Sequence, residues 1–444
     1  MMWSSTLGRL RSAVAASMIV IAATSLIPVA SAGTVSPKTK RVSVGTDGAE
    51  PNAASYWSSL SANGRFVAFE SSASNLVAND TNGTEDVFVR DRRTGTTNRV
   101  SVNSAGVEGD QGSALAAISA TGRFVVFRSG ATNLVKLDTN GVADVFIRDR
   151  KLGITRRVSL RSNGAEGNSY SDNPSVSQDG RFVAFASNAT NLVPGDDNAS
   201  RDIFLHDRKT GRTRILSRNR QGSPSNGNSF WPYISSDGRS VVFQSDATDL
   251  VAGDTNAVPD IFVHRTATGV TRRVSVRSSG IQANAYSNDA RISADGRFVV
   301  FASTASNLVG NDENAQRDIF VHDRATGTTT RVSLSSAGAE ADGQSDVPSI
   351  SSDGRLVSFR SDATNLVGGD TNLVSDVFVH DRTRDRTRRA SVNSVFTEGN
   401  DLSYDPSISA DGRWVVFNSR ATNLIASDAN AAEDIFVRGP LRRP

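Results

Sequence analysis

The feature that most constrains this chain is a repeat of 58 residues. The dipeptide Gly-Arg recurs at this spacing without insertion or deletion, beginning at Gly64, Gly122, Gly180, Gly238, Gly296, Gly354 and Gly412. A unit of this kind cannot bury its own apolar surface, so neighbouring copies must stack on one another. The sequence therefore predicts one repeat domain, instead of the two or three domains that 444 residues would suggest.

Each unit is predicted to be a meander of four antiparallel strands, A to D. Asp-Gly and Thr-Gly supply the positive φ that tight hairpin turns need, and each lies between two runs of β-branched and aromatic residues. Runs such as Phe182–Phe185 and Ile435–Val437 are apolar at consecutive positions, which is typical of strands covered on both faces. Strand D, for example Thr96–Ser101, is rich in Thr and Arg and is predicted to be the outer edge.

The two ends of the repeat region favour a closed ring over a linear β-solenoid. Arg41–Val44 has the pattern of a D strand without the three strands that should precede it, and the last copy ends after its C strand at Arg438. We therefore expect the N-terminal strand to complete the last blade. The predicted fold is all-β, a seven-bladed β-propeller of four-stranded antiparallel blades over residues 39–438, with a C-terminal tail over 439–444.

The repeated text resembles a known family. Ser-x-Asp-Gly-Arg-Phe-Val-Ala-Phe, followed by Asp-Ile-Phe-Val-x-Asp-Arg-x-Thr-Gly, is similar to the TolB-type, WD-like propeller repeat. The resemblance covers about Thr39 to Arg438 and implies a propeller fold. The family includes translocation proteins, peptidase propellers and many exported proteins, so the resemblance specifies the fold rather than the function.

The first 32 residues have the pattern of an export signal. Arg9 and Arg11 precede an apolar run from Ala13 to Ala30, and Ala30-Ser31-Ala32 is a small-residue cleavage pattern. Polar residues and Pro28 interrupt the run, which disfavours a membrane anchor. We expect a signal peptide over 1–32, a short linker over 33–38, and a mature protein that is secreted or periplasmic and has no membrane span.

Composition limits the chemistry and the partners of the chain. The formal net charge is only +3, which argues against a nucleic-acid partner. With no cysteine, disulfides and a cysteine nucleophile are excluded. Gly-x-Ser-x-Gly, His-Glu-x-x-His and phosphate-loop Gly-Lys motifs do not occur. We expect a monomer, and an enzyme is the less favoured interpretation.

Each copy carries Asp-x-Asn-x-x-x-Asp between strands B and C. Two carboxylates and an amide in one loop provide part of the oxygen set that calcium takes. The favoured alternative is that Asn and Asp fold the loop through Asx turns, so that calcium is possible but not required. The residues are Asp80, Asn82, Asp86, Asp138, Asn140, Asp144, Asp196, Asn198, Asp202, Asp254, Asn256, Asp260, Asp312, Asn314, Asp318, Asp370, Asn372, Asp376, Asp428, Asn430 and Asp434.

The histidines share one repeat position, where the remaining copies carry arginine. Because arginine is not a metal ligand and each histidine would lie in a different blade, we interpret the position as a polar strand end. The histidines are His206, His264, His322 and His380.

The aromatic residues outside the predicted core indicate a recognition surface. Eighteen of the 20 Phe occupy three repeat positions, which marks them as core. The other aromatics gather where strand D leads into the next strand A, on the face that also bears the B–C loops. Five glutamates share this connection, so the face should be acidic. The candidate ligand-binding residues are Tyr56, Trp57, Tyr170, Phe230, Trp231, Tyr233, Tyr286 and Tyr404.

These observations favour an exported binding or scaffold propeller that recognises a protein or a glycan through the face with the D–A and B–C loops. Three alternatives stay open. The aromatics could plug the channel mouth or pack between blades. The chain could be a calcium-dependent polysaccharide lyase or hydrolase. It could also be a structural calcium-binding surface protein.

Overall fold

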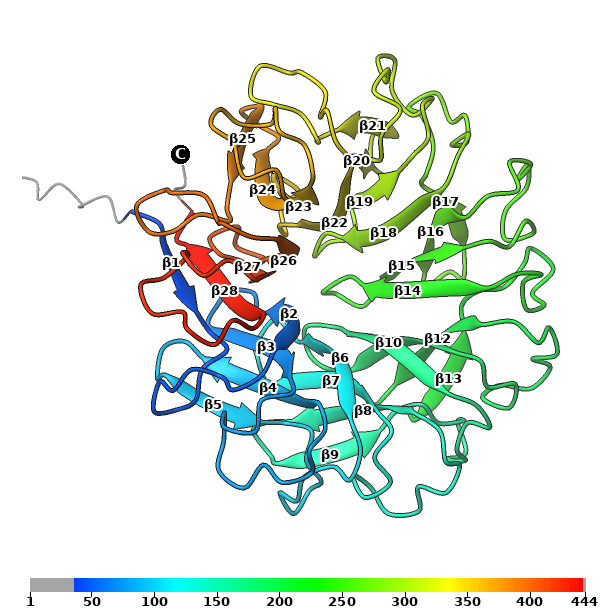
Figure 1. The fold of residues 1–444 in the computed structure, drawn as a ribbon. Helices are drawn as coiled ribbons and strands as arrows, with labels where there is room; N and C mark the ends of the chain where they lie inside the picture. Colours follow the sequence, from blue (N-terminus) through cyan, green and yellow to red (C-terminus); the bar gives the residue numbers. More distant parts are fainter. Residues whose placement is uncertain (1–35, 442–444) are drawn as a thin grey trace, which may run out of the picture. The chain divides into compact units, whose positions relative to one another are not determined.

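The computed structural model describes residues 36–441, which form 28 strands and no helix. The strands make seven antiparallel sheets of four strands each, arranged around a common axis (Figure 1). The predicted all-β, seven-bladed propeller is therefore confirmed. The predicted signal peptide and the last residues of the predicted C-terminal tail lie outside the described residues.

The four strands of a blade follow one another outward from the axis. The innermost A strands are β2 (Ser55–Leu60), β6 (Ser113–Ile118), β10 (Ser171–Val176), β14 (Ser229–Ile234), β18 (Ser287–Ile292), β22 (Ser345–Ile350) and β26 (Ser403–Ile408). The B strands are β3 (Phe66–Ser71), β7 (Phe124–Ser129), β11 (Phe182–Ser187), β15 (Ser240–Ser245), β19 (Phe298–Ser303), β23 (Leu356–Ser361) and β27 (Val415–Ser419). The C strands are β4 (Asp86–Asp91), β8 (Asp144–Asp149), β12 (Asp202–Asp207), β16 (Asp260–Arg265), β20 (Asp318–Asp323), β24 (Asp376–Asp381) and β28 (Asp434–Gly439). The outer D strands are β5 (Thr96–Arg99), β9 (Ile154–Arg157), β13 (Arg212–Ile215), β17 (Thr271–Arg273), β21 (Thr328–Arg331), β25 (Arg386–Arg389) and, for the seventh blade, β1 (Lys38–Arg41).

The ring closes because both ends of the propeller share one sheet. β1 pairs antiparallel with β28, with Lys38 opposite Gly439 and Arg41 opposite Phe436 (Figure 1). β26 contacts β2 as each innermost strand contacts the next. The prediction that an N-terminal strand completes the last blade is confirmed.

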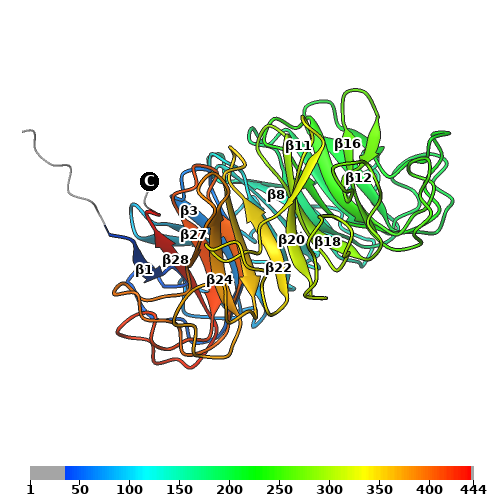
Figure 2. The same ribbon diagram turned by 90° about the horizontal axis from the view of Figure 1, so that it is seen from above.

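The apolar core lies between neighbouring blades, which pack face to face (Figure 2). One cluster combines Ile147 of the second blade with Phe185 of the third. Another combines Val437 of the seventh blade with Phe69 of the first, so the closing interface is as apolar as the others. Because a fully buried large apolar side chain contributes about 1.5–3 kcal/mol, these interfaces are the main source of stability.

The Gly-Arg motif has a packing role. Gly122 has a φ of +73°, and a Cβ there would lie 2.1 Å from the ring of Phe66 in the preceding blade. The next residue, Arg123, makes a two-pronged pair with Asp149, with Nε–Oδ1 at 2.9 Å and Nη2–Oδ2 at 2.6 Å. The same pair recurs as Arg65–Asp91, Arg181–Asp207, Arg297–Asp323 and Arg355–Asp381. The motif therefore fixes a turn and ties strand B to strand C.

Candidate functional site

The Asp-x-Asn loops are folded by Asx turns. In the first blade the Asn82 side-chain oxygen accepts a hydrogen bond from the Thr84 amide at 3.1 Å. The Asn82 side-chain amide donates to Asp86 at 3.1 Å and to the Gly109 carbonyl at 2.9 Å. Asp86 also accepts a hydrogen bond from the Ser101 hydroxyl. The loop is therefore held by its own side chains and by the start of the next repeat.

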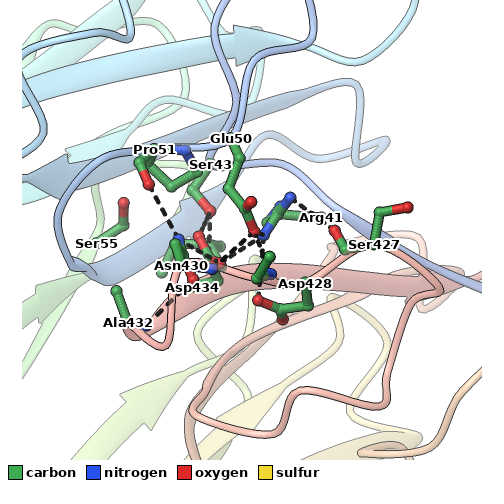
Figure 3. Close-up of polar contacts among 12 residues, drawn as sticks. Arg41, Ser43, Glu50, Pro51, Ser55, Ser427, Asp428, Asn430, Ala432 and Asp434 are labelled. Atoms are coloured by element: carbon green, nitrogen blue, oxygen red, sulfur yellow. Dashed lines mark hydrogen bonds and ion pairs between the residues drawn. The ribbon is translucent and has the colours of Figure 1, made fainter.

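In six of the seven loops an arginine lies among the carboxylates. In the seventh blade Arg41 lies 3.3 Å from Asp428 and 2.9 Å from Asp434, and it also contacts Glu50 (Figure 3). A guanidinium stays protonated in proteins, so it offsets part of the negative charge of these carboxylates at any ordinary pH. The equivalent arginines are Arg99, Arg157, Arg273, Arg331 and Arg389. The third blade has Ile215 at this position.

The four histidines lie near the ends of C strands and are buried. His206 Nδ1 lies 2.9 Å from the Thr213 hydroxyl, which itself donates to the Leu160 carbonyl. The imidazole must therefore donate from Nδ1. In the first blade Arg90 donates to Thr97 in the same way, at 3.0 Å. The shared role of the position is to donate to a threonine on strand D.

The structure places the candidate aromatic residues on the innermost strands. Tyr56 and Trp57 lie in β2, Tyr404 lies in β26, and Phe230, Trp231 and Tyr233 lie in β14. Tyr170 and Tyr286 immediately precede β10 and β18. The A strands surround the axis (Figure 1), and of the candidate residues Trp57, Trp231 and Tyr233 line a cavity among these strands.

Each innermost strand has a β-bulge centred on its third residue. The register with strand B shifts there in all seven blades, and the residue has a φ between 39° and 56°. Side chains other than Gly rarely adopt this conformation, and such residues cluster at functional sites. We call these residues the channel ring: Trp57, Leu115, Asn173, Trp231, Asp289, Val347 and Asp405.

All residues of the channel ring except Asp289 line a cavity of about 100 Å³. Trp57 of the first blade and Trp231 of the fourth stack across the channel, with ring centroids 6.2 Å apart and planes at 20°. Trp57 is 39% exposed, so part of its indole is available to a ligand. A large aromatic surface therefore stands at a narrow opening.

One side of the channel is acidic. The pKa of Asp405 is raised to about 7, mainly by burial and to a smaller extent by the charge of Glu433. Arg291, 3.6 Å from the centre of the Tyr233 ring, lowers it. Burial also raises the pKa of Tyr404, which hydrogen-bonds to Glu433. These groups can donate and accept hydrogen bonds at neutral pH.

The opposite side carries arginines that are already oriented. Arg201 pairs with Asp172 and donates to Asn173 at 2.8 Å. Its guanidinium lies 5.6 Å from the Tyr170 ring centre and 5.4 Å from that of Phe230. The channel mouth thus combines planar cations, carboxylates and aromatic rings from different blades.

Sequence reasoning missed the charged residues of the channel. Asp405, Arg291, Arg201 and Glu433 were not among the candidates because the repeat was read through its consensus. The signal was disagreement between copies: the third residue of strand A differs in most blades, whereas the first residue is serine in all seven. Such variation marks positions that the fold does not dictate.

Comparison with known proteins supports the fold. No protein-family model and no curated protein sequence matches this chain. An oligogalacturonate lyase in complex with manganese superposes with a TM-score of 0.54 and 13% identity, covering 90% of this chain and 93% of that one. The β-propeller domain of the trilobed protease from Pyrococcus furiosus has a TM-score of 0.51 and 10% identity, covering 87% and 95%. TolB from Acinetobacter baumannii has a TM-score of 0.40 and 14% identity, covering 76% and 62%.

The predicted propeller fold is confirmed. At identities this low the similarity concerns the fold alone. The Pyrococcus domain is described as having an open velcro topology, whereas here β1 and β28 pair. Among residues 36–441, no helix is long and apolar enough to cross a membrane.

Proposed function

We propose that this protein is an exported binding module whose channel mouth takes a glycan. The observation that carries the proposal is the channel ring, where a strained backbone position is repeated in every blade but filled by different side chains. Strain of this kind persists where the surrounding structure over-determines it, and it often serves binding. The asymmetric lining is what a repeat scaffold needs to recognise one ligand.

The side chains favour a glycan over a folded protein partner. A cavity of about 100 Å³ admits one sugar ring or one side chain, so the ligand has to enter by its end. The partly exposed indole of Trp57 offers a flat apolar face, and Arg201 and Asp405 offer hydrogen bonds to hydroxyl groups. A peptide tail is the other occupant that fits, and it is an outcome of the test.

The test is binding of the full chain to a glycan array and to a peptide library. Trp57→Ala should reduce glycan binding at least about tenfold, since aromatic pairs and buried aromatic area contribute more than 1 kcal/mol. Leu152→Ser is the matched control, because Leu152 is 60% exposed in a turn between strands C and D, on the face away from the B–C loops. Leu152→Ser should keep the native melting temperature, and Trp57→Ala should stay folded but melt slightly lower, because it loses the stack with Trp231.

Unchanged binding by Trp57→Ala would remove the channel from the proposal. If the native chain binds peptides and no glycans, the ligand class in the proposal is wrong but the channel remains the binding site. Loss of binding by Leu152→Ser alone would place recognition on the opposite face.

A second candidate function is cleavage of an acidic polysaccharide. Asp405, with a pKa of about 7, could act as a general acid or base in the channel, and Arg291 could hold a substrate carboxylate. Incubation with a panel of cell-wall and plant polysaccharides tests it. Product formation that disappears in Asp405→Asn, while glycan binding remains, would establish an enzyme.

A further inference from the structure

The B–C loop of the third blade, residues 195–202 between β11 and β12, differs from the other six at its centre. In the first blade Arg99 lies 3.0 Å from Asp80 and 3.0 Å from Asp86. Its other terminal nitrogen donates to the Asn79 carbonyl at 2.9 Å. The guanidinium thus joins three oxygens of one loop, and the same arrangement recurs in the five other blades that have the arginine.

In the third blade this cation is replaced by an apolar residue. Ile215 pairs with Phe204 in the same register in which Arg99 pairs with Phe88. The glutamate that contacts the arginine in the first blade, Glu108, corresponds to Pro224 in the third. The arginine of the six other blades and the glutamate of five of them are therefore both absent here; the fourth blade has Gln282 at the glutamate position but keeps Arg273.

The third-blade loop nevertheless keeps its acidic residues and its fold. Asn198 donates to Asp202 at 2.9 Å and to the Ser225 carbonyl at 2.8 Å. Ser217 donates to the other oxygen of Asp202. The scaffold that orients the carboxylates is thus the same as in the blades that hold an arginine.

The decisive observation is an unpartnered oxygen. Asp196 is 8% exposed, and its Oδ1 has no hydrogen-bond partner. In the other six blades the equivalent Oδ1 is the atom that contacts the guanidinium. The Oδ1 of Asp254 in the fourth blade also lacks a hydrogen bond, but it has Arg273 at 2.9 Å as an ion-pair partner. Burying a carboxylate oxygen without a partner is costly, so a cation beside Asp196 would stabilise the charged form of this side chain.

The surrounding charges do not supply that cation within the described chain. Arg218 is close enough to influence Asp196 and Asp202 electrostatically, but it donates to the Gly222 carbonyl and forms no ion pair with either. Asp197 adds negative charge near Asp196. Burial raises the pKa of Asp202 to about 7.

We propose that the third-blade loop binds one calcium ion between Asp196 and Asp202, at the place where the other blades hold a guanidinium. Carboxylate oxygens, together with the carbonyl of Gly195 at the position of Asn79, form the hard oxygen set that calcium prefers, with water completing it. A divalent ion matches the charge of two carboxylates that have lost both arginine and glutamate. The repeat thus has six sites closed by its own side chain and one that takes a metal.

The experiment measures calcium binding by the full chain after treatment with a chelator. Isothermal titration with calcium chloride should give one site per chain, and calcium should raise the melting temperature by a few degrees. Ile215→Arg restores the residue of the other blades and should abolish both effects. Asp196→Asn, which keeps the shape of the side chain, should also abolish both effects. It provides the test if Ile215→Arg does not fold.

Asp254→Asn in the fourth blade is the matched control, because Arg273 fills that loop, and it should leave calcium binding unchanged. Absence of binding by the native chain would overturn the proposal. So would binding that persists in Asp196→Asn, or a stoichiometry near seven, which would mean that the arginine-filled loops also take the ion.

Discussion

At the scale of single residues, the buried histidines couple folding to pH. His206 and His264 lie in an apolar environment, and burial lowers their pKa from 6.5 to about 4. Burial lowers the pKa of His322 and His380 as well. Between about pH 6.5 and 4 these histidines are protonated in the unfolded chain but neutral in the folded chain. They therefore destabilise the fold as the pH falls through this range.

The prediction concerns His206→Gln, which keeps a donor toward Thr213 but does not titrate. The free energy of unfolding of the variant minus that of the native chain should be up to about 3 kcal/mol larger at pH 4 than at pH 7. Urea unfolding at both pH values measures it. The comparison must be between variant and native chain, because carboxyls with raised pKa, such as Asp202, change stability in the opposite direction. An equal pH dependence would contradict the prediction.

A second residue-scale prediction separates the two reasons for glycine in the repeat. Gly122→Ala should destabilise the fold by about 2–4 kcal/mol, because a positive φ and a clash with Phe66 act together. Gly141 has a similar φ of +67° but open space around its Cα. Gly141→Ala should therefore cost only about 1 kcal/mol. Chemical denaturation of both variants checks it, and equal losses would show that the ring contact is unimportant.

At the scale of the element, the bulge of strand A links backbone strain to binding. Val347 has a φ of 46°, and a β-branched side chain in this region is a strong outlier. Asn173 occupies the same position in the third blade and tolerates the conformation better. Strain at this position is therefore a property of the blade geometry, and the blade geometry does not determine which side chain occupies it.

The element-scale prediction is that Val347→Asn stabilises the protein by about 0.5–1 kcal/mol. Val357, on the neighbouring strand and fully buried, is the control. Val357→Asn should destabilise by about 3 kcal/mol, since it buries an amide in the core. Thermal and urea unfolding give both values. A loss of stability in Val347→Asn would show that the valine side chain matters more than its backbone.

Strands, turns and ring closure could be predicted because the repeat presents the same evidence many times. The channel could be predicted only in part. Trp57 and Tyr404 are visible as unusual aromatics. Asp405 directly follows Tyr404, but Glu433 lies before another strand of the same blade and Arg291 lies in a different blade. The left-handed bulge could not be predicted from Trp57, Leu115 or Val347, because these residue types show no preference for it.

At the scale of the whole molecule, the pairing of β1 with β28 holds the ends together. Arg41 of β1 forms ion pairs with Asp428 and Asp434 of the seventh blade, and Val42 joins the apolar cluster between that blade and the first. Without this segment, β28 would become an open edge. Exposed edges pair with other chains.

A chain beginning at Gly45 tests this role against a control that begins at Ser36. The shorter chain should lose at least about 3–5 kcal/mol, because buried aspartates lose their arginine, and it should associate through β28. Calorimetry and light scattering after size exclusion measure stability and mass. If the two chains have the same melting temperature and both stay monomeric, the ring is held by its apolar interfaces alone.

The stacked indoles of Trp57 and Trp231 come from blades that are not neighbours, so their contact joins two separate parts of the ring across the channel. Anything threaded along the axis has to push them apart. The tryptophan fluorescence of the unlabelled protein should then change as the channel is occupied, so that occupancy can be followed without a label.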